Sequence, residues 1–168
     1  MTDFTVRPAE TADQPVVERL WHLFRHDMSA YDGQLPLPDA TFRADRLRAA
    51  FTEPGWAAYL FTQEDRPAGF AFVRNLDGPG PTVLNSFFLV HAARRRGHGL
   101  AAARDVLARH PGDWEVAFQD ANRAAVAFWP RVAAACADEA GWRLEHRPTP
   151  GEPERPQDAW ICFTVPAR

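Results

Sequence analysis

Lysine is absent from this sequence of 168 residues, and all 19 of its basic residues are arginine. Without lysine the chain cannot form a Schiff base, supply the phosphate-binding lysine of a P-loop or have a lysine of its own acylated. Cysteine is scarce as well, with Cys136 and Cys162 far apart and no Cys-x-x-Cys pair. Such spacing does not support a zinc site, so we expect a protein without a metal.

Long hydrophobic runs are also missing. The first ten residues, MTDFTVRPAE, contain no apolar signal core, and no stretch reaches the roughly 20 apolar residues of a membrane-spanning helix. The formal net charge is −3 at pH 7, whereas a protein that binds nucleic acid usually carries a basic surface. We therefore expect a cytoplasmic protein with neither a membrane nor a nucleic acid among its partners.

The hydrophobic pattern predicts one α/β domain over residues 1–168. Alternating or short apolar runs predict strands at 3–7, 56–63, 68–75, 82–91, 114–119, 142–146 and 159–165. Helical spacing predicts helices at 13–30, 41–52, 97–110 and from Asn122 to Cys136. Short turns predict an antiparallel meander, and the strand–helix–strand unit of 82–119 predicts one parallel pair. The expected fold is a mixed, mostly antiparallel sheet of seven strands with about four helices on its two sides.

The stretch ARRRGHGLAA at 93–102 joins a predicted strand to a predicted helix. The free amides of a helix N-terminus form an anion site, and glycine lets phosphate oxygens approach the backbone. Arginines at the lip would add forked donors. The stretch contains neither GxxxxGK[ST] nor GxGxxG. From these residues alone, a phosphate site, a tight turn beside solvated arginines and a nucleic-acid contact all stay open, although the acidic balance argues against the last.

A second motif follows at 122–129, NRAAVAFW. Arg94, Gly97 and Gly99 fit the pattern RxxGxG, and the later stretch fits NxxAxxF followed by an aromatic residue. With the order of the predicted elements, these two motifs make the chain resemble the GNAT superfamily of N-acetyltransferases. The resemblance covers nearly the whole chain and is greatest to a bacterial subgroup with Phe-Trp in place of Phe-Tyr.

The resemblance implies that acetyl-coenzyme A is the acetyl donor. Its pantetheine arm would pair with Phe88, Leu89 and Val90, whose amides would hold the acetyl carbonyl. Asn122 would contact the same arm, and Phe128 and Trp129 would line the thioester end. The pyrophosphate would bind the amides of Arg95, Arg96, Gly97, His98, Gly99, Leu100 and Ala101, with the His98 side chain facing solvent.

The implied reaction is direct attack on the thioester by a primary amine of a small molecule or peptide, within a ternary complex. Many relatives have a tyrosine where this chain has Trp129, and an indole N–H is not a usable acid. The catalytic residues stay unassigned, with Tyr31, Asn85 and His91 as the candidates. The same departure leaves open a non-catalytic sensor or interaction module that binds acyl-coenzyme A.

Two further expectations concern partners. Acceptor specificity usually depends on loops, which here are residues 30–40 and 147–158. Exposed strands such as 159–165 are candidates for pairing between subunits, so a homodimer is one expected assembly.

Overall fold

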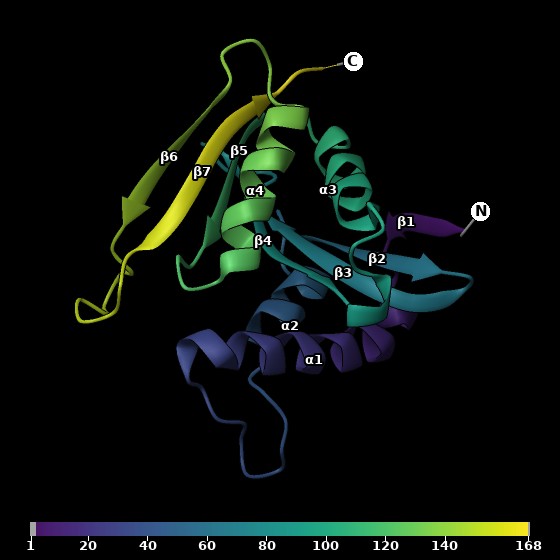
Figure 1. The fold of residues 1–168 in the computed structure, drawn as a ribbon. Helices are drawn as coiled ribbons and strands as arrows, with labels where there is room; N and C mark the ends of the chain where they lie inside the picture. Colours follow the sequence, from purple (N-terminus) through teal and green to yellow (C-terminus); the bar gives the residue numbers. More distant parts are fainter. Residues whose placement is uncertain (1–2, 168) are drawn as a thin grey trace.

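A computed structural model describes residues 3–167, and its strands form one seven-stranded sheet in the order β1-β2-β3-β4-β5-β7-β6. Neighbouring strands are antiparallel except β4 and β5, which are parallel. This arrangement confirms the predicted fold class, including the meander and the parallel pair (Figure 1). The strands are β1 (Phe4–Pro8), β2 (Ala57–Gln63), β3 (Arg66–Arg74), β4 (Thr82–Leu89), β5 (Gly112–Phe118), β6 (Trp142–Arg147) and β7 (Asp158–Val165).

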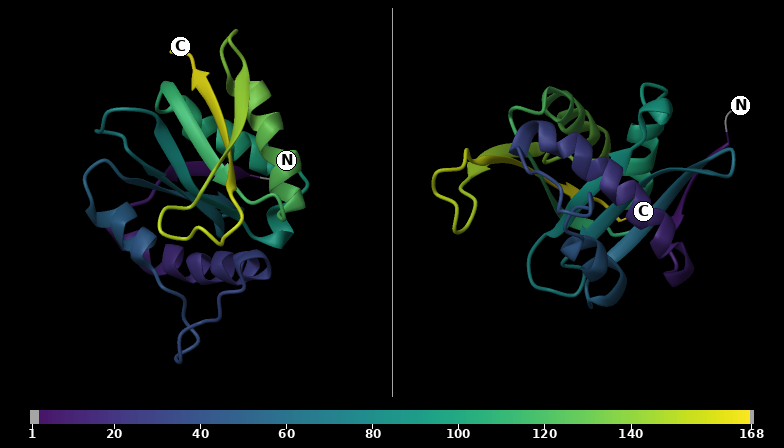
Figure 2. Two further views of the ribbon diagram at one scale, coloured as in Figure 1. Left: turned by 90° about the vertical axis from the view of Figure 1, so that its left-hand side faces the viewer. Right: turned by 90° about the horizontal axis from the view of Figure 1, so that it is seen from below.

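Helices cover both faces of the sheet (Figures 1 and 2). On one face α1 (Gln14–Asp32) and α2 (Asp45–Thr52) enclose an aromatic core that includes Trp21, Phe70 and Phe72. On the other, α3 (His98–Ala108) and α4 (Arg123–Cys136) pack on a larger core around Trp114. Side chains alternate along each strand, so β3 contributes to both cores. Two short 3₁₀ helices, η1 (Thr11–Asp13) and η2 (His91–Ala93), complete the described elements.

None of the helices within residues 3–167 combines the length and the hydrophobicity that crossing a membrane would require.

The second helix begins later than predicted. Residues 41–44 are not helical, and α2 starts at Asp45. The side chain of Asp39 accepts the Thr41 amide at 3.0 Å, and Nδ1 of His22 accepts the Phe42 amide at 3.2 Å. These side-chain hydrogen bonds stabilise a non-helical turn before Asp45, which competes with an extra helical turn.

A β-bulge in β4 opens the sheet. The register of β3 against β4 skips Asn85, which is therefore the extra residue of the bulge. Beyond it β4 and β5 diverge, since they pair only over residues 82–84 and 114–116. Figure 1 shows the resulting V between the two halves of the sheet. Between the two halves, residues 85–89 of β4 have no strand partner on the side of β5.

The strand predicted to pair between subunits is not at an edge. β7 lies between β5 and β6, so both of its hydrogen-bonding edges are occupied within the chain and that expectation is wrong. The outer strand on this side is β6, which carries the exposed residues Trp142 and Leu144.

Candidate functional site

Two cavities meet where β4 and β5 diverge. One, of about 500 Å³, opens towards α1 and α2 and is lined by five arginines; we call it the arginine cavity. The other, of about 850 Å³, runs from the end of α1 along β4 to residues 94–100 and α4; we call it the loop cavity. Both are lined by Phe87, Asn122 and Trp129. A molecule in one cavity can therefore reach a molecule in the other.

The backbone of residues 95–100 presents a row of free donors. Within the described chain, the amides from Arg95 to Leu100 have no hydrogen-bond partner. Arg95 and Gly97 adopt left-handed backbone conformations, at φ 63° and 81°, and such alternation turns successive N–H groups towards one point. The Ala101 amide donates to the carbonyl of Gly97 at 3.1 Å. The free amides therefore extend only to Leu100, one residue short of the predicted end at Ala101, because the Ala101 amide already belongs to the helical hydrogen bonds of α3.

The two glycines of this loop have different roles. Gly97 is the N-cap of α3, and a Cβ there would meet nothing within 4 Å, so its left-handed φ is what favours glycine. A Cβ on Gly99 would lie 3.3 Å from Cε2 of Phe128 and 3.5 Å from Cδ1 of Leu89. Gly99 therefore lets α3 approach the residues that line the loop cavity.

The half-buried Arg94 side chain is anchored by contacts within the protein. Its Nε donates to the carbonyl of Leu89 at 2.7 Å, and its Nη2 donates to Oδ2 of Asp27 at 2.7 Å. The guanidinium also lies over the Phe88 ring, 5.5 Å from the centroid. These contacts occupy the donors that the sequence suggested for a ligand. Arg95 and Arg96 are exposed and remain as the arginines of the lip.

His98 does not face solvent, contrary to expectation. Only 9% of the residue is exposed, and its ring stacks on Phe4 with 4.4 Å between centroids. The reason is tertiary: β1 lies beside the first turn of α3, which the local sequence does not show. Its Nδ1 is buried without a partner among the described residues.

The backbone amides of β4 point alternately towards β3 and towards the side of β5. Val90 donates to the carbonyl of Ala68 at 2.8 Å, so its amide is not free for a ligand. Amides alternate in direction along a strand, which places that of Phe88 on the β3 side too. Leu89 is then the one of the three predicted residues whose N–H faces the gap beside β5.

The predicted cofactor residues mostly line the loop cavity. Those that do are Phe88, Leu89, Arg94, Arg95, Gly97, Gly99, Leu100, Asn122, Phe128 and Trp129. Those that do not are Val90, Arg96, His98 and Ala101.

Aromatic rings form the junction between the cavities. Trp129 is 7% exposed and meets Phe87 edge-on at 5.4 Å and Phe128 at 4.8 Å. Asn122 begins the same helix, and its Oδ1 accepts the Ala125 amide at 3.1 Å. This bond caps α4 and orients the side-chain NH₂ of Asn122 at the point where the cavities meet.

The three catalytic candidates do not converge. Asn85 lies in the arginine cavity, where its Oδ1 accepts the hydroxyl of Ser86 at 3.1 Å. Tyr31 and His91 line the loop cavity instead, and the His91 side chain is 78% exposed beside Asp27. No pair among them shares a hydrogen bond within the described chain.

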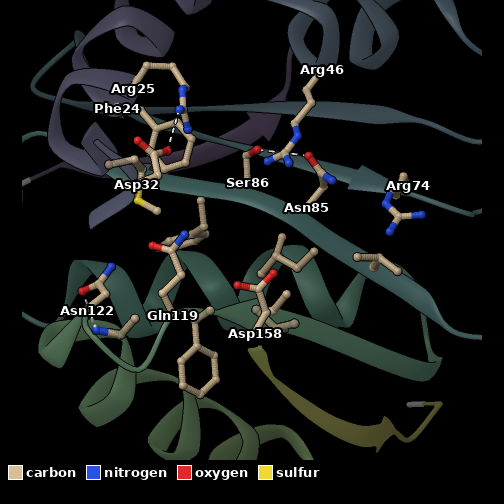
Figure 3. A pocket seen from close by; sticks show the side chains of 18 of the residues that line it. Phe24, Arg25, Asp32, Arg46, Arg74, Asn85, Ser86, Gln119, Asn122 and Asp158 are labelled. Carbon is tan, nitrogen blue, oxygen red and sulfur yellow. Dashed lines mark hydrogen bonds and ion pairs between the residues drawn. The ribbon is translucent and has the colours of Figure 1, made fainter. Parts of the chain in front are cut away.

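Sequence reasoning missed the polar walls of the arginine cavity, shown in Figure 3. Arg46, Arg74 and Gln119 come from α2, β3 and the end of β5, and they face Asp158, which lies in the predicted specificity loop 147–158 and begins β7. Along the sequence each is an ordinary polar residue, and no spacing joins them. Gln34 and Arg155 also line this cavity, which brings both predicted specificity loops to it.

The fold is that of the GNAT acetyltransferases, and solved structures of that class match the chain over almost its whole length. An acetyltransferase from Thermus thermophilus has a TM-score of 0.66 and 17% identity, covering 96% of this chain and 97% of its own. The ribosomal-protein-S18-alanine N-acetyltransferase of Escherichia coli has a TM-score of 0.62 and 17% identity, covering 99% and 96%. A GNAT-family acetyltransferase from Staphylococcus aureus has a TM-score of 0.64 and 10% identity, covering 98% and 100%.

No protein-family model matches the sequence, and no curated protein matches it either. The resemblance inferred from the two motifs is thus confirmed at the level of the fold.

Proposed function

We propose that the protein is an N-acetyltransferase that takes the acetyl group from acetyl-coenzyme A and transfers it to a primary amine. One observation carries the proposal: two cavities meet at the divergence of β4 and β5, and one of them ends at a row of free amides. Donor and acceptor can thus enter from different sides and meet at Phe87, Asn122 and Trp129.

The loop cavity fits the donor. The amides of residues 95–100 lie at the positive end of α3 and suit a diphosphate, with Arg95 and Arg96 adding charge at its rim. The Leu89 amide facing the gap can pair with the pantetheine arm or polarise the thioester carbonyl. The rings of Phe128 and Trp129 provide an apolar wall for the thioester end.

The transfer then follows from proximity. The lone pair of a neutral amine attacks the thioester carbonyl carbon, a C–N bond forms, and the carbonyl oxygen becomes an oxyanion. Collapse of this intermediate breaks the C–S bond and releases the coenzyme A thiolate, which takes up one proton. The new amide nitrogen loses one proton. Holding the two reactants together accounts for much of the acceleration in such reactions.

The protein offers few groups for these proton transfers. Among the residues that line the arginine cavity there is no His, Glu, Tyr or Cys. Its three aspartates are each within ion-pair distance of an arginine: Asp32 of Arg25, Asp45 of Arg43 and Asp158 of Arg155. We infer that water accepts the amine proton, and that the acceptor reacts as the small fraction already present as free amine.

The lack of a free base among the residues of the arginine cavity favours a second candidate, a module that binds acyl-coenzyme A without transferring the acyl group. A cavity without a free base and with Trp129 at the junction is compatible with binding alone. The two candidates share the donor site and differ in turnover.

Titration calorimetry with acetyl-coenzyme A tests the shared site. The variant Arg95→Glu/Arg96→Glu reverses two exposed charges at the rim and should weaken binding by about tenfold or more. The matched control Arg19→Glu/Arg66→Glu makes the same change at exposed arginines that line neither cavity. If both doubles bind like the wild type, or the wild type does not bind, the assignment of the loop cavity is wrong. Release of coenzyme A in the presence of amines then separates the transferase from the binding module.

A further inference from the structure

The arginine cavity carries positive charge that nothing in the described chain neutralises. Three of its five arginines pair with its three aspartates, as described above. The side chains of Arg46 and Arg74, which line this cavity, make no ion pair and no hydrogen bond within residues 3–167. The whole chain has a net charge of −3, so a cavity with two surplus cations is a local departure from the acidic balance.

Both surplus arginines belong to one wall. In Figure 3 the Arg46 side chain descends from α2 towards Ser86 and Asn85 on β4, and Arg74 faces the same space from the end of β3. Solvent reaches Arg46 through the open cavity. Partial burial by the cavity walls and repulsion from Arg25, Arg74 and Arg155 nevertheless lower the pKa of Arg46. Arg46 and Arg74 carry like charges and have no partner carboxylate, so an anion bound between them would relieve their repulsion.

The opposite wall has the opposite chemistry. Oε1 of Gln119 is buried without a partner among the described residues, and Asp158 lies on the same side in Figure 3. Both present oxygen atoms that accept hydrogen bonds, as an amine or ammonium group requires. Gln119 follows directly on the end of β5 and is three positions before Asn122, so this wall adjoins the junction with the loop cavity.

We propose that the acceptor is a small amine that carries an anionic group, a carboxylate or a phosphoryl group. Arg46 and Arg74 bind the anionic group, and the amine is directed to Gln119 beside the junction. This inference rests on the proposed acetyl transfer and specifies its substrate class. It also defines which end of the molecule is acetylated.

The size of the cavity indicates a small molecule. A volume of about 500 Å³ lies within the range of roughly 300–1,000 Å³ of small-molecule sites. Its lining comes from both helices of one face, from β3, β4, β5 and β7, and from α4. A cavity of this volume, lined by so many elements, fits a compact acceptor better than an extended peptide.

Matched pairs of amines test the proposal. Phosphoethanolamine is compared with ethanolamine, γ-aminobutyrate with butylamine, and alanine with ethylamine, at saturating acetyl-coenzyme A, by release of coenzyme A. We expect kcat/KM to be at least tenfold higher for the anionic member of one or more pairs. Arg46→Gln and Arg74→Gln should each reduce that preference at least tenfold, chiefly through KM. Arg19→Gln removes an exposed arginine of α1 that lines neither cavity, and should leave the preference unchanged.

A binding measurement decides the case in which no amine of the panel reacts. Phosphate or glutarate is added at constant ionic strength, with coenzyme A present to occupy the loop amides, and the melting temperature is recorded. The anion should raise the melting temperature of the wild type and of Arg19→Gln by several degrees more than that of Arg46→Gln/Arg74→Gln. Equal shifts in all three proteins would overturn the proposal.

Different results would contradict the proposed function and the proposed acceptor class. If acetyl-coenzyme A does not bind to the wild type, the proposed function fails whatever the anions do. If it binds and neutral amines react as well as anionic ones, or an acidic peptide is preferred to the small acids, only the acceptor class is wrong.

Discussion

Oδ2 of Asp27 on α1 lies 2.7 Å from Nη2 of Arg94, a residue of the loop motif 67 positions later in the sequence. The same arginine donates to the carbonyl of Leu89 at 2.7 Å. One side chain therefore joins α1, the end of β4 and the loop that presents the free amides. The conformation of that loop depends on contacts that lie outside it.

The first prediction concerns this anchor. Arg94→Ala removes both hydrogen bonds and the contact with the Phe88 ring, and should lower the free energy of unfolding by about 2 kcal/mol. Asp27→Ala removes one bond and should cost about 1 kcal/mol. Urea unfolding measures both values. The neighbouring Arg95→Ala, at an exposed position, should change stability by less than about 0.5 kcal/mol. Equal effects at Arg94 and Arg95 would show that the anchor contributes nothing.

The second prediction concerns the close approach of α3 to α4. Gly99→Ala places a Cβ 3.3 Å from the Phe128 ring, which packs against Phe87 and Trp129 and cannot withdraw freely. We expect a loss of about 1–2 kcal/mol from overpacking. Phe128→Leu in the same chain makes room for the new methyl group, so the double variant should lose about 0.5–1 kcal/mol less than the two single losses combined.

Gly97→Ala provides the contrast in the same loop. Its Cβ would meet no atom within 4 Å, but φ is 81°, so the expected cost of about 1 kcal/mol is conformational. Phe128→Leu should not reduce it. If both glycine variants respond alike to Phe128→Leu, the distinction between a packing glycine and a conformational glycine is wrong.

The third prediction is a pH dependence of stability. Nε2 of His110 lies 2.5 Å from the hydroxyl of Tyr59, and burial, followed by repulsion from Arg109, lowers the pKa of His110 from its ordinary value of 6.5. The unfolded chain then binds this proton more tightly than the folded one. Stability should therefore be complete above about pH 6.5 and decrease as the pH falls towards the folded pKa. Urea unfolding at pH 7.5, 6.5 and 5.5 should show a steeper decrease for the wild type than for His110→Gln.

Tyr59, the hydrogen-bond partner of His110, predicts a second pH dependence of stability, at alkaline pH. Burial raises the pKa of Tyr59 above 10, so the folded state retains this proton where the unfolded chain loses it. Stability should decline as the pH rises above about 10, and Tyr59→Phe should remove that decline. A decline that persists in Tyr59→Phe would assign it to other groups.

The proposed donor side could be predicted from the sequence because its residues are contiguous. Residues 94–100 and 122–129 are each one short continuous segment, and many of the atoms proposed to bind the donor are backbone atoms. A local sequence pattern can therefore identify these segments. What the pattern could not give was the environment. The burial of His98 against Phe4 and the capture of Arg94 by Asp27 depend on elements 94 and 67 positions away.

On the proposed acceptor side, the sequence predicted the two loops but not Arg46 and Gln119, and the reason is physical. Arg46 on its helix has the sequence character of a solvated surface charge, and Gln119 follows a strand like many loop residues. They come to one cavity where β4 and β5 stop pairing, directly before the bulge at Asn85. A β-bulge is a shift in the pairing register of two strands, and β4 carries no glycine that would indicate its position in the sequence.

The last prediction tests the absence of a base from the acceptor cavity. If water takes the amine proton, kcat/KM should rise tenfold per pH unit until the acceptor is fully deprotonated, because only the free amine attacks. The inflection should then follow the pKa of the amine, moving upward by about 2 units from an acceptor with a pKa near 8 to one near 10. An inflection at one fixed pH for both amines would instead identify a group of the protein. Its loss in Tyr31→Phe or in His91→Gln would then assign that group to the loop cavity, on the side of the leaving thiolate.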